Sequence, residues 1–307
     1  MKTAYLFPGQ GAQFMGMGIE IAERYPVVEK LYHRASAVLG FDLFELCRTS
    51  PTAILQQTQN AQPAIFVTSF AHWQMTKDYL PRPSFLAGLS LGEYTALMAA
   101  GAFNFEEAVF LVRQRGLLMQ NSTVNRATKM AAIIGLEANA IADICQEASI
   151  LGLCQPTNYN APGQTVIGGD LASVNWAISL AEQAGAHKVV TLKVSGAFHT
   201  SLMQSAAEEM KKLLAKISIR DLDFPVISNV NGKPVRRAKD IRSLLVQQMT
   251  CPVRWSESMA YLANYCIDTC IEFGPGKTLS GLLKRNLPDV SIIDPKADIF
   301  PVQTLPH

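Results

Sequence analysis

The sequence predicts an α/β fold: a large domain built on a parallel sheet, with a small α+β subdomain inserted into it. Apolar runs such as Thr3–Phe7 and Ser84–Gly88 each lead through a glycine-containing turn into a helical pattern, as in a parallel α/β sheet. Between Lys129 and Val194 the order is instead strand, helix, strand, strand, helix, strand, which is typical of a ferredoxin-like unit.

These patterns set the expected boundaries of the two parts. We expect residues 1–127 and 195–307 to form the large domain and residues 128–194 to form the ferredoxin-like subdomain. Apolar periodicity predicts the elements of the large domain. Helices are expected near residues 27–39, 61–78, 105–121, 202–214, 241–249 and 256–263, and further strands near 225–229 and 269–273.

The same periodicity predicts the elements of the subdomain. Strands are expected at residues 130–135, 152–157, 165–169 and 188–194, and helices at 138–148 and 172–184. Asn158–Gln164 lies between the two middle strands and is predicted to be a polar loop, because asparagine, proline and glycine are the usual turn residues.

Composition excludes several classes of protein. The 307 residues are 49% hydrophobic and 17% charged, which suits a large core and argues against disorder. A net charge of +2 is too small to indicate nucleic-acid binding, and no apolar run is long enough to span a bilayer. The apolar segment near the N-terminus is too short for a signal peptide, so the six cysteines are expected to be reduced thiols of a cytoplasmic protein without a metal site.

A possible nucleophile stands at the end of the strand Ser84–Gly88. Gly88-Leu89-Ser90-Leu91-Gly92 has the Gly-x-Ser-x-Gly pattern of a nucleophile elbow, a sharp strand-to-helix turn that exposes a serine hydroxyl above a helix N-terminus. This motif predicts an α/β-hydrolase-like large domain. The motif alone is equally compatible with a glycine-rich turn that carries an idle serine.

The loop after the first strand is also rich in glycine. Phe7-Pro8-Gly9-Gln10-Gly11 is predicted to present backbone amides and one polar side chain at the crevice of the sheet. Its glycine spacing does not match the G-x-G-x-x-G fingerprint of dinucleotide-binding proteins, so we reject nucleotide binding.

Two further residues stand out by position. Arg115 lies in the apolar stripe of the predicted helix 105–121, so it points inward and needs a partner. From the residues alone, a structural salt bridge or a snorkelling side chain is the simpler explanation. His199 lies at the junction where the chain leaves the subdomain and returns to the large domain.

The motifs occur together in one order: Phe7-Pro8-Gly9-Gln10-Gly11, Gly88-x-Ser90-x-Gly92-Glu93-Tyr94, the Arg115 helix, Asn158-x-Asn160, Gly196-Ala197-Phe198-His199 and Gly274-Pro275-Gly276-Lys277. This ordered set closely resembles the malonyl-CoA:acyl carrier protein transacylases of fatty acid and polyketide synthesis. The resemblance covers nearly the whole chain, including the inserted subdomain.

The resemblance implies a two-step acyl transfer through a covalent serine ester. Ser90 would be the nucleophile and His199 the base, and the backbone amides of Leu91 and Gln10 would form the oxyanion hole. The only aspartates between Ser90 and His199 lie in the subdomain, so we expect a Ser-His dyad. In this family an amide or a main-chain carbonyl orients the histidine, and the matching position is Gln248.

Substrate selection is implied in the same way. Arg115 would grip the free carboxylate of a malonyl group through two parallel hydrogen bonds. Phe198 would leave little room for a branch at C2 and so favour malonyl over methylmalonyl. Gln62 and Asn160 match polar pocket positions, although both could be turn or cap residues. Leu89 replaces the histidine or glutamine found in many members and is more typical of free-standing, trans-acting acyltransferases of polyketide synthases.

The expected enzyme is therefore an acyl-carrier-protein S-malonyltransferase. It would act as a monomer without a bound cofactor, on malonyl-CoA and a phosphopantetheinylated acyl carrier protein. An acyl hydrolase on the same fold and a non-catalytic docking module are the alternatives. The cluster Arg236, Arg237, Lys239 and Arg242 could contact an acidic carrier protein, but it fits a solvated charged face better. Residues 274–277 are expected to form a turn at the active-site rim, and residues 294–307 to follow the surface or fray.

Overall fold

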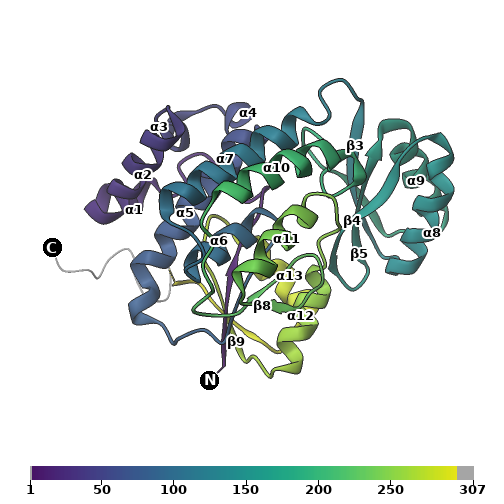
Figure 1. Ribbon diagram of the computed structural model, residues 1–307. Coiled ribbons are helices and arrows are strands. Elements are labelled where there is room, and N and C mark those ends of the chain that lie inside the picture. The colour runs from purple at the N-terminus through teal and green to yellow at the C-terminus, as the bar shows by residue number, and fades with distance from the viewer. Residues whose placement is uncertain (1, 296–307) are drawn as a thin grey trace.

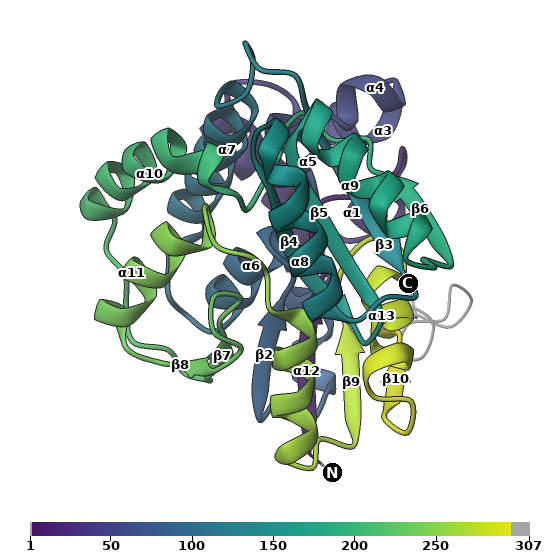
Figure 2. The ribbon, with the colours of Figure 1, turned by 90° about the vertical axis from the view of Figure 1, so that its right-hand side faces the viewer.

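The computed structural model describes residues 2–295 and contains two separate sheets (Figure 1). The large sheet has six strands in the order β10-β9-β1-β2-β7-β8. They are β1 (Thr3–Phe7), β2 (Phe85–Gly88), β7 (Val226–Ile227), β8 (Pro234–Val235), β9 (Thr269–Glu272) and β10 (Ser291–Ile293). Figure 2 shows β2 and β9 running in the same direction.

The large sheet is mixed, which corrects the prediction of a purely parallel sheet. Five strands are parallel, but β8 pairs antiparallel with β7. A tight turn causes the reversal, because the Ser228 amide donates a hydrogen bond to the Lys233 carbonyl across the hairpin at 2.9 Å. The predicted strand 225–229 is accordingly only two residues long, and both β8 and β10 were missed because they are so short.

Helices cover both faces of the large sheet. Alternating residues of β1 face opposite sides: Tyr5 and Phe7 join the larger hydrophobic core, while Ala4 and Leu6 join a smaller one under α12 and α13. The helices are α1 (Ile19–Arg24), α2 (Pro26–Leu39), α3 (Leu43–Thr49), α4 (Thr52–Leu55), α5 (Thr58–Thr76), α6 (Leu91–Ala99), α7 (Phe105–Asn121), α10 (Gln204–Lys216), α11 (Ala238–Gln248), α12 (Trp255–Asn264) and α13 (Thr278–Asn286).

Local sequence explains where several helices begin. The capping box of Asn104 and Glu107 starts α7, which is the helix that carries Arg115. The Asp42 side chain accepts a hydrogen bond from the Glu45 amide at 2.9 Å and so starts α3, a helix that the periodicity did not predict.

The small sheet is antiparallel, with the strand order β4-β5-β3-β6. Its chain order is β3 (Thr128–Ile134), α8 (Ala138–Ala148), β4 (Cys154–Ala161), β5 (Gln164–Asp170), α9 (Leu171–Gln183) and β6 (Lys188–Thr191). It has a hydrophobic core of its own, built with α8 and α9. In Figure 1 this unit lies at the right-hand end of the molecule.

The predicted polar loop at Asn158–Gln164 is wrong for most of its length. Residues 158–161 continue β4, and only Pro162 and Gly163 turn the chain, with φ of 66° at Gly163. The strand continues because it has partners on both sides. β5 lies along one edge, and on the other the Tyr159 amide donates to the Val253 carbonyl at 2.9 Å.

The edge of β4 is also where the small-sheet unit contacts the rest of the protein. The Val253 amide donates to the Thr157 carbonyl at 2.8 Å, and the Asn286 side chain donates to the Asn160 carbonyl at 2.9 Å. The small sheet is thereby held against α12 and α13. Within residues 2–295, no helix combines the length and the apolarity needed to cross a membrane. The expectation for residues 294–307 falls almost wholly outside the described residues.

Candidate active site

The strand β2 and the helix α6 are joined by a strained turn at Ser90. Its φ of 53° and ψ of −103° lie outside the favoured regions for a residue with a side chain, a conformation that costs about 1–3 kcal/mol. Close packing leaves no room for side chains on either flank. A Cβ on Gly92 would come within 2.0 Å of the Phe7 carbonyl oxygen, and one on Gly88 within 2.0 Å of the Gly92 backbone. The Gly-x-Ser-x-Gly pattern is therefore required by this turn.

Asn229 fixes the turn from the next strand of the sheet. Its Oδ1 accepts a hydrogen bond from the Ser90 amide at 2.6 Å, and its Nδ2 donates to the Gly88 carbonyl at 2.7 Å. No sequence pattern identified this residue. Its only signal is its place just beyond the carboxyl end of β7, the end at which open parallel sheets position functional groups.

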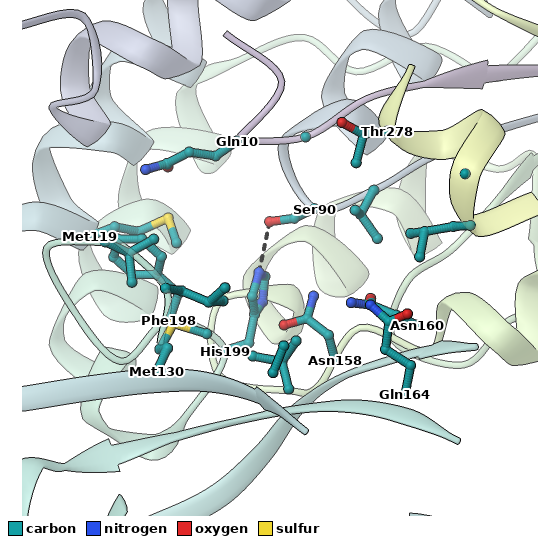
Figure 3. Close-up of a pocket in the computed structure, with 18 of the residues that line it drawn as sticks. Gln10, Ser90, Met119, Met130, Asn158, Asn160, Gln164, Phe198, His199 and Thr278 are labelled. Carbon is teal, nitrogen blue, oxygen red and sulfur yellow. Dashed lines mark hydrogen bonds between the residues drawn. The ribbon is translucent and has the colours of Figure 1, made fainter. Parts of the chain in front are cut away.

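Ser90 and His199 are in direct contact, 2.7 Å apart from Oγ to Nε2 (Figure 3). On its other side, His199 Nδ1 lies 2.7 Å from the main-chain carbonyl oxygen of Gln248. A carbonyl can only accept, so Nδ1 carries the proton and Nε2 is left to accept the serine proton. His199 itself has a φ of 61°, a second strained position in the site.

The environment keeps His199 neutral. Burial, followed by the nearby positive charge of Arg115, lowers the pKa of His199 to about 4. The imidazole is therefore available as a base at neutral pH. It also means that an imidazolium formed during a reaction would be strongly disfavoured unless another group compensates its charge.

Arg115 is only 1% exposed and points at the nucleophile. Its Nη2 donates to Ser90 Oγ and to Gln248 Oε1, both at 3.0 Å, and its Nη1 donates to Gln62 Oε1 at 2.9 Å. Neither alternative from the sequence holds: the side chain does not reach solvent, and within the described residues it has no carboxylate partner. Its Nε has no partner there either. A buried cation thus faces the serine with only neutral ligands.

Glu93 is a second buried charge, and the sequence alone suggested no role for it. It is 2% exposed, and its Oε2 accepts hydrogen bonds from Gln248 Nε2 at 2.6 Å and from the Asn229 amide at 3.2 Å. Burial is the main reason that the pKa of Glu93 is raised to about 7.

The two backbone segments expected to form an oxyanion hole lie next to each other. Leu91 is the first residue of α6, and the loop that carries Gln10 touches the elbow, since a Cβ on Gly9 would come within 2.3 Å of the Leu89 carbonyl oxygen. Within residues 2–295, neither the Leu91 nor the Gln10 amide donates to another group. The Gln10 side chain is held by Thr58 at 3.2 Å.

A cleft of about 500 Å³ opens above Ser90 between the two sheets. Figure 3 shows Ser90 and His199 between Gln10 and Thr278 above and Asn158, Asn160 and Gln164 on the side of the small sheet. Leu89, Arg115 and Phe198 also line it, and Lys277, Thr278 and Arg285 lie along its wall. Of residues 274–277, expected to form a turn at the rim, Lys277 lines the cleft.

Gln62 does not line the cleft, and the basic cluster of 236–242 agrees with the solvated charged face that the sequence favoured. Gln62 is fully buried behind Arg115 instead of lining the wall. The basic cluster of 236–242 is largely occupied: Arg236 and Arg242 donate to backbone carbonyls, and Arg237 pairs with Asp221 at 2.7 Å. Most of these cations therefore have structural partners, which weakens the case for a docking surface there.

Comparisons with known proteins agree on one family. The sequence model of the acyl transferase domain family matches residues 4–302. A malonyl CoA-acyl carrier protein transacylase of Bacillus subtilis is 42% identical and covers 99% of this chain and 97% of its own length. The crystal structure of an acyl carrier protein S-malonyltransferase from Vibrio cholerae superposes with a TM-score of 0.94 at 40% identity, covering 99% and 100% of the two chains. A structure of a malonyl-transacylase in complex with a type II polyketide synthase acyl carrier protein matches with a TM-score of 0.92 at 38% identity, covering 95% of each chain.

Proposed function

Because this chain belongs to the acyl transferase family, we propose that it transfers a malonyl group from malonyl-CoA to the phosphopantetheine thiol of an acyl carrier protein. The observation that carries the proposal is the guanidinium of Arg115, buried and without a carboxylate partner among the described residues, 3.0 Å from the Ser90 hydroxyl. A site built this way favours an acyl group that brings its own negative charge. The product would serve fatty acid or polyketide synthesis.

The first half of the reaction forms a malonyl-serine ester. Ser90 Oγ attacks the thioester carbonyl while His199 Nε2 takes the hydroxyl proton. The carbonyl oxygen becomes an oxyanion, for which the amides of Leu91 and Gln10 are the available donors. Collapse of the tetrahedral intermediate breaks the C–S bond, and His199 returns the proton to the departing CoA thiolate.

The second half repeats these steps in reverse with a new thiol. The phosphopantetheine thiol of the carrier protein attacks the ester and gives its proton to His199. His199 then protonates Ser90 Oγ as the ester bond breaks. The hydrogen bond from Nδ1 to the Gln248 carbonyl keeps the same tautomer ready for both halves. No resident cofactor enters either step.

Arg115 would select the acyl group. Once Ser90 is acylated, the Arg115 guanidinium can replace its hydrogen bond to Ser90 Oγ with hydrogen bonds to the malonyl carboxylate. Gln62 binds the guanidinium on its other side and keeps it in position. An acetyl group would leave the guanidinium without an anion. Phe198 in the cleft wall would oppose a branch at C2, and Asn160 would line the same pocket. Leu89 also lines the cleft. Because leucine at this position resembles the free-standing acyltransferases, we propose service to polyketide synthases in trans as the favoured one of the two pathways.

A hydrolase on the same fold is less well supported. Hydrolysis of stalled acyl groups does not call for a buried cation beside the nucleophile, and here that cation is Arg115.

We also infer an α/β-hydrolase-like large domain (residues 1–127 and 195–307) and a ferredoxin-like subdomain (128–194). The β-α-β-β-α-β order, the strand order β4-β5-β3-β6 and the separate core support the subdomain. We propose that the enzyme acts as a monomer in the cytoplasm. The buried Cys154 thiol donates a hydrogen bond to the Cys145 sulfur at 3.6 Å, and reduced thiols fit a reducing compartment.

Mass spectrometry of the intact protein tests the proposal. Separate incubations with malonyl-CoA, acetyl-CoA and methylmalonyl-CoA should give a stable malonyl adduct on Ser90, little acetyl adduct and little methylmalonyl adduct. Addition of a phosphopantetheinylated carrier protein should discharge the adduct onto the carrier. The Ser90→Ala variant is the control and should not load. Rapid release of free malonate without a carrier would favour the hydrolase instead, and a normal biological role for Ser90→Ala would favour a docking module.

A further inference from the structure

Glu93 is a buried carboxyl group for which the reaction steps above have no use. It lies in the first turn of α6, three residues after Ser90, and is 2% exposed. Placing a carboxyl group there is costly, because burial penalises its charged form. Its partners nevertheless match an anion: two N–H groups, from Gln248 and Asn229, both donate to the same oxygen, Oε2.

Both partners of Glu93 hold the reacting groups. Asn229 accepts the hydrogen bond from the Ser90 amide at 2.6 Å. Gln248 contacts all three groups of the site: its main-chain carbonyl binds His199, its Oε1 accepts from Arg115, and its Nε2 donates to the Ser90 carbonyl at 3.0 Å as well as to Glu93. The Gln248 amide therefore lies between an acid and a guanidinium, and it links Glu93 to both cationic positions of the site.

We infer that Glu93 is a positioning residue that must be ionised for Ser90 and His199 to react, because its negative charge, acting through Gln248, offsets Arg115 and the imidazolium that forms on His199. The inference rests on the proposed function, since it concerns the same two-step transfer. It extends that function by giving the dyad a distant anion in place of the aspartate of a triad.

The need for this anion follows from charge balance. When His199 takes the serine proton, a second buried cation forms close to Arg115. The charged and titratable groups that face Glu93 are Arg115 from α7, His199 through Gln248, and its neighbour Tyr94 on α6. Glu93 is the one carboxylate among the described residues with a hydrogen bond into this network. A malonyl group brings an anion of its own, so the dependence on Glu93 should be greatest for an uncharged reagent.

The test compares the wild-type protein with Glu93→Gln, which keeps the side-chain shape and an acceptor oxygen but removes the charge. Phenylmethylsulfonyl fluoride, an uncharged reagent, is expected to form a sulfonate ester with Ser90 Oγ as its S–F bond breaks and fluoride leaves, while His199 takes the serine proton. The adduct is counted by mass spectrometry between pH 5 and 9. The wild-type rate should rise as Glu93 ionises, near its pKa of about 7. In Glu93→Gln the rate should fall about 10- to 100-fold, the effect of one charge several ångströms away at an effective dielectric constant of about 20, and the rise near pH 7 should disappear. Malonyl-CoA loading should fall less.

Glu272→Gln is the matched control. Glu272 is another buried carboxylate, 6% exposed, but it accepts hydrogen bonds from Leu279 and Ser280 at the start of α13 and from no residue of the dyad network. This variant should keep the wild-type rate and pH profile in the sulfonylation assay.

Other outcomes overturn the inference. A folded Glu93→Gln with the wild-type rate, or a slow variant that keeps the rise near pH 7, would show that the charge of Glu93 is not needed. Should the variant not fold, the wild-type profile decides: a rate that is flat between pH 6 and 8 would exclude a required ionisation of Glu93. Because sulfonylation involves no malonyl group, these results are separate from the malonyl-CoA loading of the wild-type protein, whose absence would instead overturn the proposed function.

Discussion

The two sides of the cleft are built in different ways. On the side of the large sheet, Ser90 lies in the turn before α6, and Arg115 and Gln248 lie in α7 and α11. Buried hydrogen bonds from the Arg115 guanidinium join the three residues. On the side of the small sheet, the wall consists of apolar side chains and amides such as Asn158 and Asn160, without a buried charge among the described residues. The difference indicates that the large sheet places the chemistry and that the small sheet shapes the space for the substrate.

Removal of the base should have the largest effect on this comparison. For His199→Ala we expect malonyl transfer to fall about 10⁴-fold, because no other described side chain accepts the Ser90 proton. Transfer to a carrier protein, followed by mass spectrometry, measures it. His33→Ala, on the exposed side of α2, should keep full activity. A loss below tenfold in His199→Ala would mean that the serine is activated in another way.

Arg115→Lys separates charge from geometry on the same side of the cleft. Lysine keeps the positive charge but cannot make two parallel hydrogen bonds to a carboxylate, so malonyl loading should fall about 10- to 100-fold. Acetyl loading should change little. Arg113→Lys is the matched control, since Arg113 is two residues away on α7 and binds Gln59 and Asn60 instead. If both substitutions affected loading equally, selection by Arg115 would be refuted.

The buried charge of Glu93 should also affect stability, with a dependence on pH. Its pKa is raised to about 7 in the folded protein from an ordinary value of 4.5, so the folded state holds the proton more tightly than the unfolded state. As the pH rises from 4.5 to 7, ionisation of Glu93 should therefore lower the free energy of unfolding of the wild-type protein by at most about 3 kcal/mol. Above pH 7 this group should lower it no further. The melting temperature of Glu93→Gln minus that of the wild type should increase between pH 4.5 and 7 and stay constant above pH 7. A constant difference across the window would contradict this assignment.

The smallest effect is expected on the opposite wall. Asn160→Ala should raise the KM for malonyl-CoA about two- to fivefold and leave the turnover rate nearly unchanged, because an uncharged contact contributes about 0.5–1 kcal/mol. Trp176→Ala, on the exposed side of α9, serves as the control and should have no effect. If Asn160→Ala instead slowed turnover by about two orders of magnitude, the small sheet would take part in the chemistry, and the contrast between the two walls would be lost.

Local patterns were enough to locate part of the site. The elbow at Ser90 is visible in five consecutive residues, and the inward phase of Arg115 can be counted along one helix. His199 was found from its place at a junction between units. The family match and the similar solved structure confirm the predicted family and the α/β fold.

The missed residues depend on distant partners. Asn229 binds Ser90 across 139 positions of sequence, and Glu93 binds Gln248 across 155. Nothing near either residue in the chain indicates such a contact. The error at Asn158–Gln164 has the same origin: turn-forming residues suggested a loop, but pairing with β5 and with Val253 holds most of the segment as a strand.

The contact of β4 with Val253 has a further consequence, for aggregation. An unpaired strand edge can recruit a second chain, and β4, at eight residues, is the longest strand of the described chain that lies at a sheet edge. Its outer edge is capped by the protein's own backbone. The remaining edges are poor templates: β8 has two residues and begins with Pro234, β10 has three, and β6 has four and begins with Lys188. A substitution that detached the small sheet from Val253 would therefore expose this long edge. Such a variant should precipitate under conditions in which the catalytic residues of the large sheet are still in place.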